Sequence, residues 1–127
     1  IPNNKKNKKI KKYLKNVNLF LGSENDVLDR YYHCAKKFQI NTIVRITSDC
    51  PLIDPQIVDQ AIRKYQSEDY DYVTNTLSRS YPIGTDVEIF SFEILEKTWQ
   101  KAILPSEREH VTLFIRNKKT QIHANIF

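Results

Sequence analysis

The fold prediction starts from the stretch Val44-Arg45-Ile46-Thr47-Ser48-Asp49-Cys50-Pro51-Leu52-Ile53-Asp54-Pro55. The β-branched run over 42–46 predicts a buried parallel strand. Asp54 followed by Pro55 predicts a helix start, with Asp54 as N-cap and Pro55 in the first helical position. Asp49 then falls just past the carboxyl end of a strand, the edge at which open α/β sheets bind ligands. A carboxylate there suits Mg²⁺ beside a phosphate-bearing substrate, although a turn-capping aspartate has the same local pattern.

Helical and strand patterns alternate along the rest of the chain, without repeats or low-complexity linkers. Helices are predicted over 4–15, from the capping segment Ser23-Glu24-Asn25-Asp26, over 55–66, after a capping Ser91, and after a capping Ser106. Strands are predicted over 17–21, 42–46, 71–75, 87–90 and 121–127. This alternation predicts a single α/β domain over 1–127, with a mostly parallel sheet and helices on both faces.

Composition narrows the class of protein. The 127 residues are enough for one hydrophobic core. No apolar run approaches the ~20 residues that span a bilayer, and the lysine-rich start has no signal-peptide pattern. Cys34 and Cys50 show neither metal-ligand spacing nor a disulfide framework, so we expect two reduced thiols and a cytoplasmic protein.

The formal net charge of +5 is concentrated at one end of the chain. Residues 1–16 contain seven lysines and no acidic residue, so the remainder carries a net charge of −2. A nucleic-acid or membrane patch is one interpretation of this segment. The other, which we favour, is a solvated helix that buries a stripe of Ile10, Tyr13 and Leu14, because lysine runs usually face solvent. We therefore predict no nucleic-acid or membrane partner.

The chain has only two glycines, and both lie in informative places. Gly22 ends a predicted strand at the expected ligand edge. Gly84 follows Pro82, which predicts a tight turn before the next strand. In that strand Asp86 and Glu88 are two residues apart and share one face of the sheet. If that face is half-buried, the two carboxylates need a cation or hydroxyl groups as partners. If the face is solvated, water is enough, and the sequence supports both interpretations equally.

Four blocks of the sequence carry a resemblance to a known family. They are Gly22-Ser23 with Asp26-Val27-Leu28-Asp29-Arg30-Tyr31, then Arg45-Ile46-Thr47-Ser48-Asp49-Cys50-Pro51, then Tyr81-Pro82 with Gly84 and Asp86-Val87-Glu88, and finally Arg108-Glu109-His110-Val111-Thr112. In this order they resemble cytidylyltransferases of the spore coat polysaccharide biosynthesis protein F type. That group is similar to the sialic acid and 3-deoxy-manno-octulosonate cytidylyltransferases. Each block is weak by itself, and their shared order carries the resemblance.

The resemblance implies a Rossmann-like nucleotide-diphosphosugar transferase fold. It implies that a homodimeric enzyme uses CTP, a sugar acid and Mg²⁺ to make a CMP-sugar for surface polysaccharide biosynthesis. The resemblance implies that Asp49 and Arg45 are catalytic residues and that Asp49 is the metal ligand. It places Gly22, Ser23 and Arg30 near the nucleotide. The residues that it places near the acceptor are Asp86, Glu88, Arg108, Glu109 and His110. Because a charge among apolar neighbours is costly, we expect Arg45 to be paired with Asp86, Glu88 or a bound phosphate. A non-catalytic nucleotide-sugar or glycan-binding domain is the alternative.

The sequence departs from the family pattern in three places. Ser48 stands where the family usually has glycine, which restricts the backbone before Asp49. The family's glycine-rich nucleotide loop, with its arginine and lysine and the first strand before it, does not occur in the sequence. The later aspartate segment that supplies a second metal ligand does not occur either. We therefore expect 1–127 to be the central part of a cytidylyltransferase domain, to lack activity as an isolated chain, and to expose unpaired sheet edges.

Overall fold

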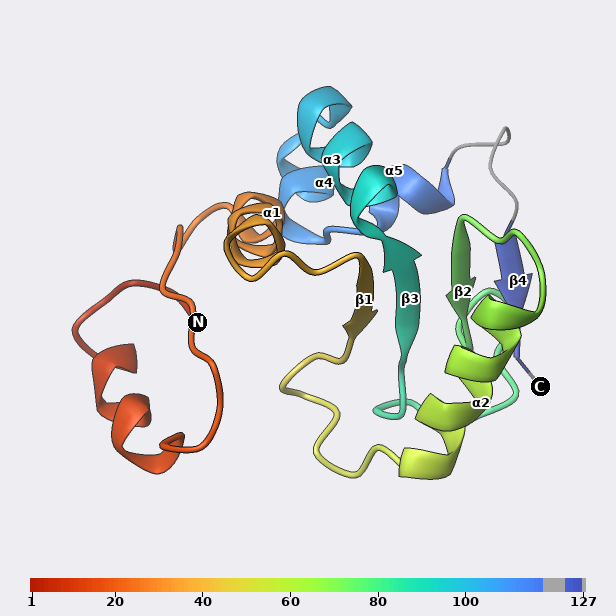
Figure 1. Cartoon of the computed structure of the whole chain (residues 1–127), viewed down its shortest axis with the longest axis horizontal. Helices are drawn as coiled ribbons and strands as arrows, with labels where there is room; N and C mark the ends of the chain where they lie inside the picture. Colours follow the sequence, from red (N-terminus) through yellow and green to blue (C-terminus); the bar gives the residue numbers. More distant parts are fainter. Residues whose placement is uncertain (118–122, 127) are drawn as a thin grey trace.

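The computed structural model describes residues 1–117 and 123–126 and has a mixed α/β architecture (Figure 1). Its elements are, in chain order, η1 (Asn7–Tyr13), α1 (Val27–Lys37), β1 (Thr42–Arg45), α2 (Pro55–Ser67), β2 (Tyr72–Thr74), β3 (Glu88–Ser91), α3 (Phe92–Lys101), α4 (Pro105–Glu109), α5 (Leu113–Arg116) and β4 (His123–Asn125). The predicted α/β class is confirmed. No helix within the described residues is long and apolar enough to cross a membrane.

The four strands form one sheet in the order β1-β3-β2-β4. Strand β3 runs antiparallel to both β1 and β2, and β2 pairs with β4 in parallel. The expectation of a mostly parallel sheet is therefore wrong for these strands. The reason lies in the connection from β2 to β3, which has no crossover helix, so the chain returns antiparallel to the strand it left.

Strand β1 is less buried than the prediction required. Its residues alternate, with Ile43 7% exposed and Val44 39% exposed. In the described part of the chain, β1 pairs with β3 on one side and has no strand on the other. One face of β1 packs against the helices through Ile43. The β-branched composition correctly predicted a strand. Because β1 lies at the edge of the sheet, its side chains alternate between buried and exposed, as in a half-buried strand.

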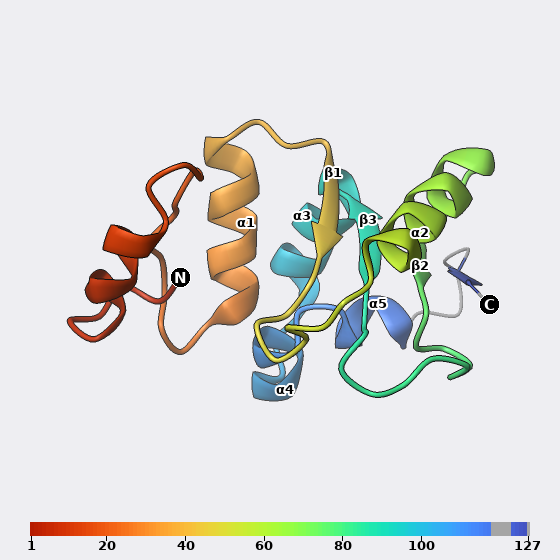
Figure 2. The ribbon, with the colours of Figure 1, turned by 90° about the horizontal axis from the view of Figure 1, so that it is seen from below.

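Helices cover both faces of the sheet, as predicted (Figures 1 and 2). On one face Tyr72 and Phe90 pack with α1, α3 and the turn before α5 in a cluster that includes Leu28, Tyr32, Ile43, Leu95, Val111 and Ile115. On the other face Val73 and Ile89 pack against α2, with Ile57, Ala61, Val87, Ala124 and Ile126. Successive strand residues point to opposite faces, so one strand contributes to both clusters.

Three helix starts follow from local sequence. Asp26 caps α1 by accepting a hydrogen bond from the Asp29 amide at 2.8 Å. Asp54 caps α2, with Pro55 in its first turn, and Ser91 caps α3. These side chains satisfy amide donors that the first helical turn leaves unpaired. All three predicted starts are confirmed.

The last predicted helix is wrong in its start and its continuity. Ser106 lies inside the first turn of α4, which begins at Pro105 with Leu104 in the N-cap position. Pro55 and Pro105 both occupy first-turn positions, which suit a residue without an amide donor. The chain then breaks at Val111, whose φ is 50°, before α5 begins. Of the predicted last strand, His123–Asn125 form β4 and Ile126 lies just beyond it, whereas residues 121, 122 and 127 lie outside the described residues.

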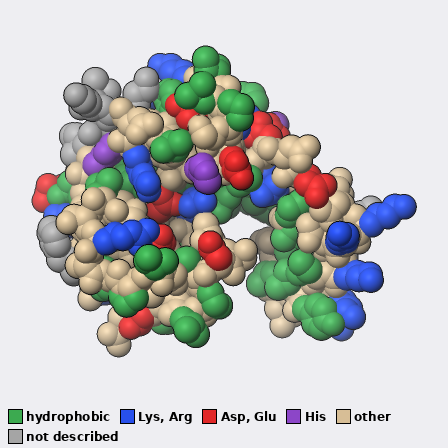
Figure 3. All heavy atoms as spheres, turned by 180° about the vertical axis from the view of Figure 1, so that it is seen from behind, with side chains coloured by type: hydrophobic (Ala, Val, Ile, Leu, Met, Phe, Trp, Pro, Cys, Tyr) green, Lys and Arg blue, Asp and Glu red, His purple; other side chains and the backbone are tan. Residues whose placement is uncertain are grey.

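The N-terminal segment also differs from prediction. Residues Asn7–Tyr13 form a 3₁₀ helix, and Tyr13 and Ile10 are 76% and 39% exposed, so the expected buried stripe does not form. A 3₁₀ helix has three residues per turn, which does not align the positions that an α-helix would bring to one face. Residues 17–21 are not a strand; an isolated bridge joins Gly22 to Pro2 instead. Lysine side chains gather on the outer surface of this segment (Figure 3).

Candidate functional site

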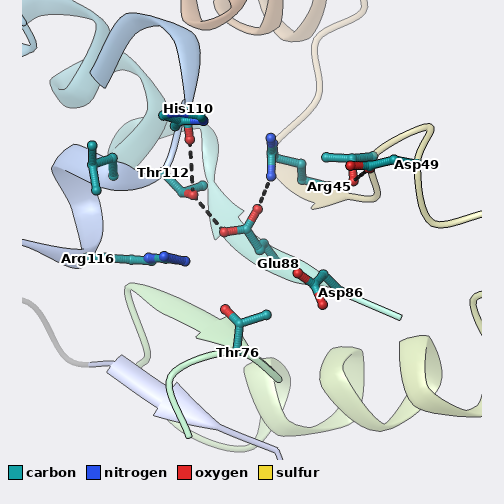
Figure 4. A pocket seen from close by; sticks show the side chains of 10 residues that line it. Arg45, Asp49, Thr76, Asp86, Glu88, His110, Thr112 and Arg116 are labelled. Carbon is teal, nitrogen blue, oxygen red and sulfur yellow. Dashed lines mark hydrogen bonds and ion pairs between the residues drawn. The ribbon is translucent and has the colours of Figure 1, made fainter. Parts of the chain in front are cut away.

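A cavity of about 390 Å³ lies beside the end of β1 (Figure 4). Its walls come from β1 and the loop that follows, from β3 and the loop before it, from the turn that joins α4 to α5, and from α5 itself. The lining residues are Arg45, Thr47, Asp49, Thr76, Asp86, Glu88, His110, Thr112, Leu113 and Arg116. The structure therefore brings five of the predicted site residues together: Arg45, Asp49, Asp86, Glu88 and His110.

A buried carboxylate organises one wall of this cavity. Glu88 is 5% exposed and forms an ion pair with Arg45. The Tyr72 hydroxyl donates to its Oε1 at 2.5 Å, and the Thr112 hydroxyl donates to the same oxygen at 2.6 Å. Three converging donors suit an ionised carboxylate, which only accepts hydrogen bonds. The expectation that Arg45 is paired is confirmed, with Glu88 as its partner.

Arg45 is held from two sides. Its guanidinium lies 5.7 Å from the centre of the Tyr31 ring, within cation–π range. Burial opposes its charge, but the Glu88 carboxylate together with the Tyr31 and Tyr72 hydroxyls raises the pKa of Arg45 above its ordinary value. Its Nε is buried and has no hydrogen-bond partner among the described residues. Arg45 is therefore a fixed cation with one donor still unused, which is uncommon for a buried polar atom.

Asp49 is the exposed acid of the cavity. It lies in the loop after β1, where the sequence predicted it, and its Oδ1 accepts a hydrogen bond from the Thr47 hydroxyl. That hydrogen bond is the main reason why the pKa of Asp49 is lowered. Within the described residues Asp49 forms no ion pair. Asp86, by contrast, is bound by both terminal nitrogens of Arg79, each at 3.1 Å.

The donor set can be compared with the needs of Mg²⁺. In the described part of the chain no group of three or more histidine, cysteine or acidic residues could hold a metal ion by itself. Mg²⁺ is commonly held by one or two carboxylates, with water and substrate phosphates as the other ligands. A single exposed carboxylate such as Asp49 fits that mode of binding.

The turn between α4 and α5 places two lining residues. Val111 is fully buried, and its φ of 50° is rare for a β-branched residue. This conformation turns the chain sharply between His110 and Thr112, both of which line the cavity. Such strain persists only where the surrounding packing holds it, and it is frequent at binding sites.

Two residues predicted near the acceptor do not line the cavity. The Arg108 guanidinium binds the Asp26 carboxylate at 2.6 and 2.8 Å and donates to the Trp99 carbonyl at 2.8 Å. It thereby ties α4 to the start of α1 and to α3. Glu109 is exposed outside the cavity. A role in acceptor binding for these two residues stays a prediction that this geometry does not support.

The three residues predicted near the nucleotide lie together at the start of α1. Arg30 donates to the Ser23 carbonyl, and a Cβ built on Gly22 would lie 2.9 Å from the Arg30 Cγ. Arg30 lines another cavity, of about 430 Å³, with Phe20, Tyr31 and the far side of Arg45 among its neighbours. Their role in nucleotide binding stays a prediction.

Sequence reasoning did not single out several lining residues. Thr47 and Thr112 belong to quoted blocks, and their positions two residues from Asp49 and from His110 were usable signals. Thr76, Leu113 and Arg116 had none, because only the folded loops and the α4–α5 turn bring them to the cavity.

A family model described as cytidylyltransferase matches residues 3–126. The chain therefore belongs to the cytidylyltransferase family, and the predicted resemblance is confirmed. It is 34% identical over 102 residues to the spore coat polysaccharide biosynthesis protein SpsF of Bacillus subtilis, and 40% identical over 99 residues to an uncharacterised protein of Methanocaldococcus jannaschii. Each alignment covers 78% of this chain and 40% of the relative, so the chain spans less than half the length of these relatives.

A solved structure shows the same fold. A cytidylyltransferase from Leptospira borgpetersenii matches with a TM-score of 0.91 and 34% sequence identity. The match covers 98% of this chain and 55% of the solved chain. The described arrangement of sheet and helices is thus the arrangement of a cytidylyltransferase structure.

Proposed function

We propose that the protein containing this chain transfers the cytidylyl group of CTP to a sugar acid and releases pyrophosphate, in the synthesis of a surface polysaccharide. The observation that carries this proposal is the family match over 3–126. The similarity to a spore coat polysaccharide biosynthesis protein supports the polysaccharide role.

The chemistry fits the residues that line the first cavity. The anomeric hydroxyl oxygen of the acceptor forms a bond to the α-phosphorus of CTP, the bond from that phosphorus to the β-phosphate oxygen breaks, and the hydroxyl proton is released. Negative charge grows on the α-phosphate oxygens during this displacement. A fixed guanidinium stabilises that charge most effectively when it needs no reorganisation. Arg45, held by Glu88 and Tyr31, meets that condition.

Asp49 is our choice for the Mg²⁺ ligand. When bound, the ion would neutralise phosphate charge and orient the leaving group. Asp49 itself contributes an exposed carboxylate beside Arg45, and the Thr47 hydroxyl fixes its orientation.

The test uses the complete protein, CTP, Mg²⁺ and a panel of sugar acids, with pyrophosphate as the detected product. We expect pyrophosphate release that requires both CTP and one of the acids, and that fails when ATP replaces CTP. Binding of CTP or of a sugar without any pyrophosphate release would contradict the proposal and favour a non-catalytic binding domain.

A further inference from the structure

The charges that line the first cavity are not all balanced. Arg45 is paired with Glu88, and Asp86 is paired with Arg79. Two charged lining residues are left. Asp49 and Arg116 form no ion pair with any residue in 1–117 or 123–126.

These two unbalanced charges lie on opposite sides of the cavity. Asp49 follows β1, whereas Arg116 is the last residue of α5. Figure 4 shows them on either side of Glu88, with the Arg116 guanidinium directed toward the space between Glu88 and Thr76. The site therefore has a negative end and a positive end.

We propose that Arg116 binds the carboxylate of the acceptor and makes the site selective for acidic acceptors. This inference rests on the proposed function and assigns one of its specificities to a residue. A guanidinium matches a carboxylate with two parallel hydrogen bonds, which a neutral hydroxyl or amide cannot reproduce. Arg108, the other arginine of this region, is already bound to Asp26 and two carbonyl groups.

An unpaired guanidinium attracts a carboxylate, so we place the acid group of the sugar beside Arg116 at the end of α5. The cavity volume of about 390 Å³ is sufficient for a sugar acid and lies in the range of about 300–1,000 Å³ typical of small-molecule sites.

The experiment measures binding separately from catalysis. Saturation-transfer NMR titrations of the complete protein compare N-acetylneuraminate, 3-deoxy-manno-octulosonate and glucuronate, each with its own neutral carboxamide. The variants are Arg116→Gln, Arg116→Lys and, as a matched control, Arg63→Gln, which changes an exposed arginine of α2 outside the cavity. Thermal melting of each variant checks that the protein is folded.

We expect the unmodified protein to bind at least one acid more tightly than its amide, by on the order of 10- to 100-fold, as for hydrogen bonds to a charged group. Arg116→Gln should remove that preference, Arg116→Lys should keep part of it, and Arg63→Gln should leave it unchanged. Equal binding of every acid and its amide, no binding of any acid, or full acid preference in Arg116→Gln would overturn the inference.

Pyrophosphate assays on the same proteins keep the two proposals separate. If an acid binds through Arg116 but no acid yields pyrophosphate with CTP, the inference stands and the proposed function fails. If pyrophosphate forms and Arg116→Gln leaves the acceptor KM unchanged, the proposed function stands and the inference fails.

Discussion

Arg45 and Glu88 form a buried ion pair, with side chains 15% and 6% exposed. Removing one charge from such a pair leaves the other uncompensated in a poorly solvated place. We expect Glu88→Gln to lower the free energy of unfolding of the complete protein by about 3 kcal/mol, measured by urea denaturation.

The matched control is Glu93→Gln. Glu93 also pairs with a cation, Lys97, but these side chains are 72% and 55% exposed. Exposed pairs contribute little because water and salt screen them. Glu93→Gln should therefore lower the free energy of unfolding far less than Glu88→Gln does. Equally small losses in the two variants would show that burial does not strengthen the Arg45–Glu88 pair.

The stability of the protein depends on pH through Tyr72, whose hydroxyl donates a hydrogen bond to Glu88. Burial, and then the charge of Glu88, raise the pKa of Tyr72 well above its ordinary value of 10.0. The folded protein thus holds the phenol proton more tightly than the unfolded chain does. The resulting stabilisation is complete below about pH 10 and is lost as the pH rises above that value.

We therefore expect the stability difference between the unmodified protein and Tyr72→Phe to narrow above about pH 10. Urea unfolding at a series of alkaline pH values measures it, and the comparison between the two proteins cancels the titration of the other tyrosines. A difference that stays constant into the alkaline range would mean that the folded state does not hold the Tyr72 proton more tightly.

Individual residues were predictable where local chemistry decides their place. Asp49 was found because a strand pattern ends before it and a helix signal, Asp54 and Pro55, follows it. Arg116 was not, because its position depends on the left-handed turn at Val111. A valine in that conformation is imposed by tertiary packing and has no local sequence signal.

At the scale of helices, Asp26 has two functions. It caps α1 through the Asp29 amide, and it binds Arg108 of α4 at 2.6 Å. Asp26→Asn keeps an N-cap but loses the charge, whereas Asp26→Ala loses both. We expect the asparagine variant to lose about 1 kcal/mol of stability and the alanine variant about 2 kcal/mol.

Asp54→Ala is the comparison, because Asp54 caps α2 through the Gln56 amide at 2.8 Å and forms no ion pair with any described residue. It should lose about 1 kcal/mol, as other caps do. Denaturant unfolding ranks the three variants. If Asp26→Ala were no worse than Asp54→Ala, the contact between α1 and α4 would contribute nothing to stability.

Helices that begin with a capping side chain were predicted well, whereas the pairing of the strands was not. The starts of α1, α2 and α3 follow from one residue and its neighbours. The direction of β3 depends on the path of the whole β2–β3 loop, so alternation of helices and strands wrongly indicated parallel neighbours. The first helix was predicted as an α-helix and is a 3₁₀ helix, because nothing in its sequence pattern distinguishes the two.

At the scale of the whole molecule, the sheet separates two apolar clusters, and the first cavity opens where the ends of β1 and β3 meet the α4–α5 turn. The family was predictable because four short blocks kept their order over nearly the whole chain. The pairing of Arg45 with a carboxylate was predicted, but the choice of Glu88 over Asp86 was not, because Asp86 is bound instead by Arg79.

The most direct test of the account is the turnover of Asp49→Asn in the complete protein across a Mg²⁺ titration. Asparagine keeps the size of the side chain and removes the charge that would hold the ion, and thermal melting serves as the folding control. Asp59→Asn, an exposed change on α2 outside the cavity, is the matched variant. Loss of a metal ligand predicts pyrophosphate release slower by on the order of 10³-fold with unchanged melting. Turnover near that of the unmodified protein at low Mg²⁺ would contradict the assignment of Asp49 as the metal ligand.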